Sequence, residues 1–357
     1  MKITSTSKVF YTIFSAFILF TSFLSAQIPA YYSEVDFTKD GDVLKSELST
    51  LIINTHDNLI PYTSGSTDTW DVVHQSDADV SISGNVVLIY GYNDTDGISK
   101  NDRTRAISLQ QGSGTSIGRW NREHVFARSL ANPNLTTNSA GPGTDVHNLR
   151  AADSQMNTYR SNRFFASGSG DSGYVGSHFY PGDEFKGDIA RIIMYMYLRY
   201  PTQCEPTNIG AGSTMYSNDI PDVFLEWNEE DPVSVFETNR NNVIASYQGN
   251  RNPFIDNPYL ATLVWNGPDA EDIWGLLSAA DVAVSSVFIY PTVVEDFVTI
   301  KGLDVSKSSI KIYNQIGQAL AFDLDTNRID VSAFSKGLYL MNIQQGNQSK
   351  TVKFLVK

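Results

Sequence analysis

The sequence contains a single cysteine, Cys204, among 357 residues. An intramolecular disulfide is therefore impossible, which excludes a small scaffold held together by cross-links. Basic residues are not in excess either: the formal net charge is −13, which argues against a broad basic binding face. Long hydrophobic runs are missing after residue 26, and no internal repeat is evident. A hydrophobic content of 41%, with 12% aromatic residues, indicates packed cores and excludes a disordered chain.

The first 26 residues form the one segment that we exclude from the fold. Lys2 and Lys8 give it a positive start, residues 9–24 are mostly apolar, and Ala26 supplies a small residue at the end. This order is typical of a cleaved secretory signal peptide. A retained membrane anchor is the alternative, because the apolar run approaches the length of a membrane span.

The chain that follows divides into two regions of different character. Residues 27–280 mix helical and strand-like patterns, which predicts an α/β mixed (α+β) domain. A short apolar run at residues 85–92 predicts a buried strand. Helical spacing of apolar residues occurs in residues 43–60, 183–200, 222–230 and 234–247.

Residues 281–357 consist of short, β-like runs separated by Gly, Asn or Asp. Several of these runs alternate apolar and polar residues, as half-buried strands do. The region therefore predicts a small C-terminal β-sandwich.

Two sequence words carry the candidate chemistry: RWNREHVFARS at residues 119–129 and DVHNLRA at residues 145–151. Each predicts a strand, and a loop rich in Asn, Thr, Gly and Pro connects them. Asp153 can cap a helix that runs to about residue 165 and carries Asn157. A neutral imidazole can activate water beside oxygen ligands that hold a hard cation, and Glu123, His124 and Asn157 supply these groups.

This strand, loop, strand and helix resemble the endonuclease I family, within the ββα-metal (His-Me finger) nuclease superfamily. The matching words are WNREHVF, DVHNL and N-x-x-R-S-N, followed in order by KGDIAR, DPVSVFETNRN and QGNRNPFIDNP. The resemblance covers about residues 31–275. It implies a fold in which Glu123 and His124 lie at the end of a strand, since adjacent residues inside a strand point to opposite faces.

The resemblance also implies roles for matching positions. His124 corresponds to the general base that deprotonates the attacking water, and Glu123 and Asn157 correspond to ligands of one divalent metal. Mg²⁺ is the expected ion, with Ca²⁺ or Mn²⁺ as alternatives. Ion pairing of Glu123 with Arg122 or Arg128 is the competing interpretation for that carboxylate. For Asn157 the competing role is helix capping or bonding to the backbone.

Other candidates are weaker because no family position transfers to them. Arg160 and Arg163 are candidates for steadying the phosphate in catalysis, by nearness in sequence alone. Arg122 is a candidate substrate contact. His147 and Asn148 either orient the loop by hydrogen bonds or touch substrate. A further pair, Arg251 and Asn252, either lines the cleft or forms a turn.

The charge distribution supports binding at this region. Residues 100–165 contain nine basic and four acidic residues, a local net charge of +5 in an acidic protein. A local basic groove can contact phosphates while the remainder of the surface repels them. Ordinary surface arginines are the alternative interpretation.

The tail resembles the C-terminal sorting domains of proteins exported by the type IX system of Bacteroidetes. The matching runs are YPTVVEDFVTI, IKIYNQIGQAL, IDVSAFSKGLYLMNI and KTVKFLVK. This implies the secretion machinery as a partner and a passage through the periplasm to the cell surface or beyond. A carbohydrate-binding sandwich is the alternative, although the tail is poor in aromatic residues for sugar stacking.

Together these features predict a secreted, metal-dependent, largely sequence-nonspecific endonuclease that acts on DNA, RNA or both. The resemblance implies products with 5′-phosphates. We expect a monomer with no stable membrane span. Two other classes stay open: a phosphodiesterase of another substrate class, and a non-catalytic surface adhesin with a decayed site.

Overall fold

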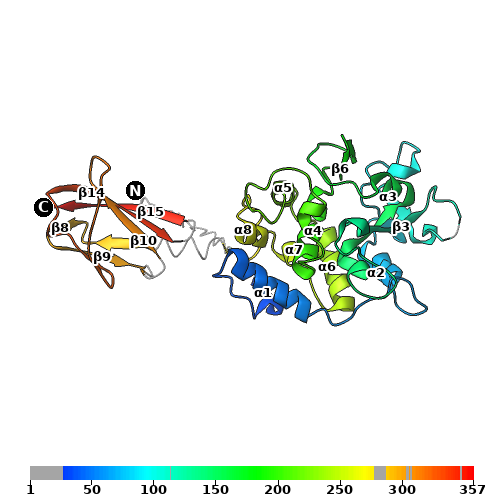
Figure 1. Cartoon of the computed structure of the whole chain (residues 1–357), viewed down its shortest axis with the longest axis horizontal. Helices are drawn as coiled ribbons and strands as arrows, with labels where there is room; N and C mark the ends of the chain where they lie inside the picture. Colours follow the sequence, from blue (N-terminus) through cyan, green and yellow to red (C-terminus); the bar gives the residue numbers. More distant parts are fainter. Residues whose placement is uncertain (1–26, 113, 277–286, 303–304, 306–307, 346–347) are drawn as a thin grey trace, which may run out of the picture.

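The computed structural model describes residues 27–112, 114–276, 287–302, 305, 308–345 and 348–357. Figure 1 shows a larger body that mixes helices with short strands, and a smaller body made of strands. The buried apolar side chains of residues 287–356 form a cluster of their own. The expected division near residue 280 and the expected signal peptide at residues 1–26 both lie outside the described residues.

The larger body is built around one buried helix, α4. It packs against α1 and α5, and nearly all of its side chains are buried. The helices of this body are α1 (Gly41–Asn54), α2 (Thr69–Ser76), α3 (Ser154–Arg160), α4 (Lys186–Arg199), α5 (Asp222–Glu230), α6 (Val235–Gln248), α7 (Pro253–Asp256) and α8 (Tyr259–Trp265). Within the described residues, no helix is long and apolar enough to cross a membrane.

The strands of the larger body form three separate antiparallel pairs. They are β1 (Asn85–Val87) with β2 (Thr104–Ala106), β3 (Trp120–His124) with β4 (Leu149–Asp153), and β5 (Gly173–Val175) with β6 (His178–Tyr180). In the second pair, Glu123 lies opposite Arg150 and His124 opposite Leu149. The helix α3 begins directly after β4.

The smaller body contains two sheets, in the orders β11-β10-β14-β15-β8 and β12-β13-β9-β7. All neighbouring strands are antiparallel except β15 and β8. Side chains from both sheets share the single buried cluster, as expected for two packed sheets. The strands are β7 (Phe288–Tyr290), β8 (Val293–Val294), β9 (Phe297–Lys301), β10 (Ser309–Tyr313), β11 (Ala319–Leu320), β12 (Leu324–Asp325), β13 (Arg328–Asp330), β14 (Gly337–Gln345) and β15 (Gln348–Val356).

Several elements of the structure differ from those predicted. The strand expected at residues 145–151 starts only at Leu149, because the Asp145 side chain accepts the backbone N–H of His147 and favours a 3₁₀ turn there. The helix expected to reach residue 165 ends at Arg160, where Ser161 has a positive φ of 57°. Helix α2 was not predicted.

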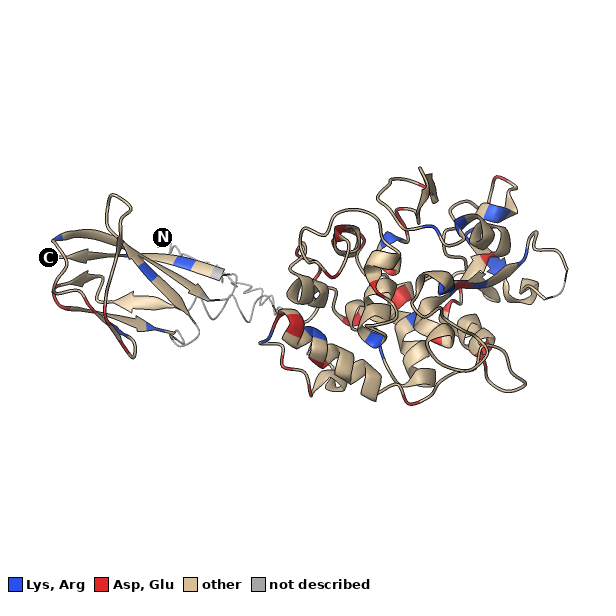
Figure 2. Cartoon of the chain, in the orientation of Figure 1, with Lys and Arg blue, Asp and Glu red and all other residues tan. Residues whose placement is uncertain are grey.

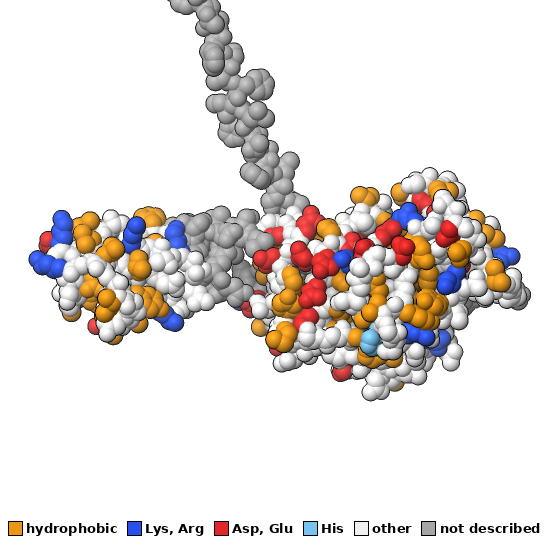
Figure 3. Space-filling model, turned by 90° about the horizontal axis from the view of Figure 1, so that it is seen from above, with side chains coloured by type: hydrophobic (Ala, Val, Ile, Leu, Met, Phe, Trp, Pro, Cys, Tyr) orange, Lys and Arg blue, Asp and Glu red, His pale blue; other side chains and the backbone are white. Residues whose placement is uncertain are grey.

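The acidic residues are spread over the helices of the larger body, including α1 and α5 (Figure 2). The face in Figure 3 carries a band of acidic side chains with few basic ones. A broad basic surface is therefore not present on this face, in agreement with the net charge of −13.

Candidate active site

The site is built from β3, β4 and α3, and its first requirement is a fixed start for α3. The Asp153 carboxylate accepts the backbone N–H groups of Gln155 and Met156, which satisfies two of the free donors of that helix end. Arg105 forms an ion pair with the same carboxylate. These contacts fix the orientation of α3 against the β3–β4 pair.

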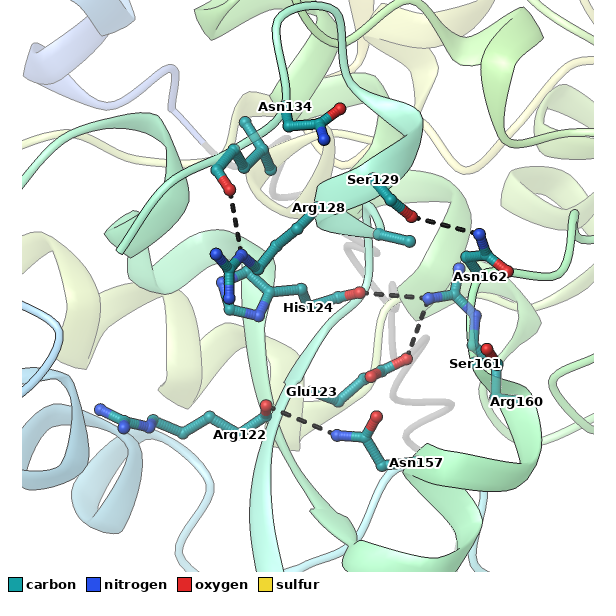
Figure 4. Close-up of a pocket in the computed structure, with 12 residues that line it drawn as sticks. Arg122, Glu123, His124, Arg128, Ser129, Asn134, Asn157, Arg160, Ser161 and Asn162 are labelled. Carbon is teal, nitrogen blue, oxygen red and sulfur yellow. Dashed lines mark hydrogen bonds and ion pairs between the residues drawn. The ribbon is translucent and has the colours of Figure 1, made fainter. Parts of the chain in front are cut away.

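Glu123, His124, Asn157 and Arg160 line one open cleft (Figure 4). The structure therefore brings together the three residues expected to carry the chemistry. His124 is the last residue of β3, so the position at the strand end follows the prediction. The other residues that line the cleft are Arg122, Ala127, Arg128, Ser129, Asn134, Leu135, Ser161 and Asn162.

Glu123 is buried, and one of its oxygens has two donors. Oε1 accepts the Tyr90 hydroxyl at 3.0 Å and the Arg160 Nη1 at 3.1 Å. Burial raises the pKa of the Glu123 carboxyl to about 7, against the opposing effects of Arg160 and the Tyr90 hydrogen bond. The charge of Arg160 therefore does not compensate for the removal of the Glu123 carboxylate from water. A further cation beside this carboxylate would stabilise its charged form.

Asn157 presents its carbonyl oxygen rather than its amide nitrogen for binding. Its Nδ2 donates to Oδ1 of Asn121 at 2.8 Å and to the backbone carbonyl of Arg122 at 3.5 Å. Because the nitrogen is engaged, Oδ1 is the atom left for a ligand, and the described residues give it no donor. Carboxylate and amide oxygens suit a hard divalent cation.

The donor set is sparse. Among the described residues, no group of three or more His, Cys, Asp or Glu side chains is arranged to hold a metal ion. A divalent cation at Glu123 and Asn157 would therefore keep several water ligands, as Mg²⁺ commonly does. The residues present fit such an ion.

His124 is held as a neutral base. Its Nε2 lies 2.8 Å from the carbonyl oxygen of Gly143, so Nε2 carries the proton and donates it there. This leaves Nδ1 as the unprotonated nitrogen. Burial lowers the pKa of the imidazole to about 4, which the nearby positive charge of Arg128 supports. The Tyr62 ring stacks on the imidazole with centroids 5.6 Å apart.

The two arginines chosen as candidates for steadying the phosphate are placed differently. Arg160 is fully buried and donates to Glu123 and to the carbonyls of His124 and Val125, so it orients Glu123. Arg163 does not line the cleft; its guanidinium lies over the Tyr174 ring, 4.3 Å from the centroid.

Arg122 reaches the cleft only with part of its chain, because its guanidinium points away from Glu123 and Asn157 (Figure 4). It lies over the rings of Tyr62 and Trp70 and donates to Thr69. Its Nη1 and Nη2 atoms donate inside the protein, to Thr69 and Thr63, so a substrate contact by this guanidinium stays a prediction.

Four further predicted substrate contacts lie away from the cleft. His147 and Asn148 are buried, and Asn148 bonds both the N–H and the carbonyl of Phe126, which orients the loop. Asn252 caps α7, and Arg251 pairs with Asp256. His147, Asn148 and Asn252 form buried contacts, and Arg251 is held by the partly buried Asp256, so none of the four lines this cleft.

The sequence reasoning missed Arg128 as a cleft residue. It is exposed, lines the cleft, and donates through Nε to the Leu135 carbonyl at 3.0 Å. Within the described part of the chain it forms no ion pair, so its charge is available to an anion. Its membership in the same RWNREHVFARS word was the available signal.

Comparison with known proteins gives two family matches. The Endonuclease I family matches residues 40–259, and the secretion system C-terminal sorting domain matches residues 288–357. An extracellular ribonuclease of Bacillus amyloliquefaciens is 37% identical over 68% of this chain and 80% of its own length. An extracellular ribonuclease of Bacillus subtilis is 36% identical over 67% and 80%.

A solved structure matches a smaller part of this chain. PorZ, a surface component of the type-IX secretion system of Porphyromonas gingivalis, is 23% identical over 22% of this chain and 12% of its own. The TM-score of 0.20 is too low to bear on the fold.

Proposed function

The chain belongs to the endonuclease I family and carries a C-terminal secretion sorting domain, and from this premise we propose that it is a metal-dependent endonuclease using His124 as general base. It is a nuclease that is secreted or held at the cell surface. The observation that carries the proposal is the meeting of Glu123, His124 and Asn157 in one cleft.

In this proposal, β3, β4 and α3 are the ββα-metal motif. Nδ1 of His124 takes a proton from the attacking water, while the bond from Nε2 to the Gly143 carbonyl keeps the tautomer fixed. Arg160 keeps the Glu123 carboxylate facing the cleft. A divalent cation, Mg²⁺ before Ca²⁺ or Mn²⁺, held by Glu123 and Asn157 would stabilise negative charge on the scissile phosphate.

The substrate class follows from contacts to phosphate. The cleft offers Arg128 and polar side chains rather than an array for base recognition, which favours cleavage with little sequence preference. RNA is the first substrate to test, because both Bacillus relatives are named extracellular ribonucleases. DNA is the second, and 5′-phosphate products are expected.

The direct test is incubation of the purified mature protein with structured RNA and with plasmid DNA, each with Mg²⁺ or with EDTA. Cleavage of either polymer that stops in EDTA is expected. Hydrolysis of small phosphodiesters alone would favour a phosphodiesterase of another substrate class. Binding to a surface without any hydrolysis would favour an adhesin and would contradict the proposal.

The metal ligands give a specific prediction. Glu123→Gln and Asn157→Ala are each expected to lower activity at limiting Mg²⁺ by at least about 10–100-fold, because losing a direct ligand costs no less than losing its supporting residues. The measurement is cleavage rate against Mg²⁺ concentration. Asn162→Ala, an amide in the same cleft that bonds Ser129, is the matched control for metal dependence. Unchanged Mg²⁺ curves for both ligand variants would contradict this metal site.

Arg128 gives a second prediction. Arg128→Met is expected to lower kcat/KM about 10–100-fold, since a hydrogen bond to a charged group contributes about 1.5–3 kcal/mol. The control is Arg103→Met, because Arg103 is already paired with Glu184 at the surface. Equal kcat/KM values for the two variants would remove Arg128 from the phosphate contacts.

In this proposal the C-terminal tail directs export of the protein and takes no part in catalysis. We place the nuclease domain at residues 27–280 and the sorting domain at residues 281–357, with residues 1–26 as a cleaved signal. Support comes from the separate buried cluster of the tail and from the family match that begins at residue 288. The type IX machinery is the proposed partner, and the protein is proposed to act as a monomer.

A further inference from the structure

A column of four side chains stands beside the cleft, and the proposed chemistry does not use it. Tyr159 and Tyr174 stack with ring centroids 3.9 Å apart and an interplanar angle of 14°. The Lys100 Nζ lies over the Tyr159 ring, 4.2 Å from its centroid. Arg163 lies over the Tyr174 ring at 4.3 Å. Each ring of the stacked pair therefore has a cation over it.

The column borders the cleft through consecutive residues. Ser161 and Asn162 line the cleft, and Arg163 follows them directly in the chain. Tyr159 belongs to α3, the helix that presents Asn157. Lys100 comes from a 3₁₀ turn, Ser99–Asn101, that packs against α3. A nucleic-acid strand that leaves the cleft beside Asn162 would lie close to Arg163, the next residue in the chain.

Both cations lack a carboxylate partner within the described residues, although the protein carries 39 acidic and 26 basic residues. Arg103, close by in sequence, does have one, in Glu184. A cation over an exposed ring contributes only about 0.5–1 kcal/mol, so the column is a modest gain for folding. The column holds the positive charges of Lys100 and Arg163, neither of which has a carboxylate partner among the described residues, in fixed positions.

The chemistry of the column selects phosphate as the ligand. The cations cover the rings, and the rings cover each other, so bases are not offered a free stacking face. Lys100 and Arg163 are each partly exposed and Tyr174 is 44% exposed, so phosphate oxygens can approach the column from the solvent side. Contacts of this kind are independent of base sequence.

We propose that Lys100, Tyr159, Tyr174 and Arg163 form a phosphate-binding subsite, outside the catalytic cleft, for the strand of nucleic acid that extends past the scissile bond. The subsite rests on the proposed nuclease function and adds to it a preference for long substrates. Its contribution is to substrate binding, so it lowers KM for long chains without changing the chemical step.

The test measures binding by fluorescence anisotropy in EDTA, where cleavage is stopped, using the full mature chain and a long labelled RNA over a series of salt concentrations. Lys100→Met is expected to reduce the slope of log K against log salt by about 0.7, the value for one phosphate contact on a single strand. Adding Arg163→Met is expected to reduce it by a similar further amount. Arg103→Met is the matched control and should keep the wild-type slope, because its charge is already paired.

Two variants test the rings. Tyr174→Leu is expected to remove most of the contribution that Arg163 makes to the salt slope. Tyr174→Phe should retain that contribution. Arg163 also donates to the backbone carbonyls of Tyr159 and Arg160, so its replacement can loosen the end of α3. Lys100→Met has no such bond among the described residues and keeps the proposal falsifiable.

Cleavage assays separate this proposal from the function on which it rests. With Mg²⁺, Lys100→Met should raise KM for long RNA and leave kcat and the cleavage of a very short oligonucleotide unchanged. A salt slope for Lys100→Met equal to that of Arg103→Met would overturn the subsite while leaving the nuclease intact. Wild-type protein that cuts nothing would instead defeat the nuclease proposal, and the binding slopes would still decide the subsite.

Discussion

His124→Ala is expected to reduce single-turnover cleavage about 10²–10⁴-fold, the usual contribution of a positioned general base. The imidazole is held by the bond from Nε2 to the Gly143 carbonyl, and burial keeps it neutral by lowering its pKa to about 4. Alanine removes the proton acceptor but leaves Glu123 and Asn157 in the cleft. Metal-dependent binding of nucleic acid should therefore survive, and a labelled substrate measures both quantities.

His178→Ala is the matched control for this variant. His178 lies in β6, outside the cleft lining, and the variant should cut as fast as the wild type. Circular dichroism should show both variants folded. If folded His124→Ala cuts within a few-fold of the wild type, the general-base role is ruled out. His147 would not replace it, because that side chain is buried against Asn250 and Tyr195.

Arg150→Met is expected to produce the largest loss of stability, about 3–5 kcal/mol in the free energy of unfolding. Arg150 is fully buried and bonds Asp77 at 3.1 Å and Asp188 at 2.6 Å. Among the described residues, its removal leaves Asp188 without an ion-pair partner and Asp77 with Arg240 alone, at 3.2 Å. Thermal unfolding followed by circular dichroism should show a midpoint lower by roughly 6–20 °C.

The surface pair of Arg103 and Glu184 provides the comparison for stability. Both side chains are almost half exposed, at 43% and 48%, so Arg103→Met should change stability by no more than about 1 kcal/mol. A midpoint for Arg150→Met close to that of Arg103→Met would show that the buried ion pairs contribute little beyond a packed methionine. The ion pair between Arg150 and Asp77, which are 73 positions apart in the sequence, would then position the two segments without adding to the free energy of unfolding.

Local patterns were enough to predict several elements. The apolar spacing predicted α4 and α5 closely, since both helices bury most of their side chains. The family resemblance implied that Glu123 and His124 lie at the end of a strand, and His124 is the last residue of β3. By contrast, α2 has eight residues and begins with a capping box formed by Asp68 and Asp71, a signal that was overlooked.

The substrate contacts were predicted less well, because local sequence patterns do not show which arginine side chains are buried in the folded protein. Residues 100–165 have a net charge of +5, which predicted a basic groove. The structure buries Arg105, Arg122, Arg150 and Arg160, and three of these four face carboxylates. Much of the positive charge of this segment is therefore buried. The exposed Arg128 lines the cleft.

The sequence by itself determined the family, the adjacent Glu123 and His124, and the secretion tail, because each of these is a word of neighbouring residues. Only the tertiary structure decided which arginines can reach a phosphate. Arg150 meets Asp77 and Asp188 through contacts far apart in the chain, and Arg163 rests on a ring from β5. The physical reason is that a charge acts according to its distance from partners and from water, and folding alone sets both.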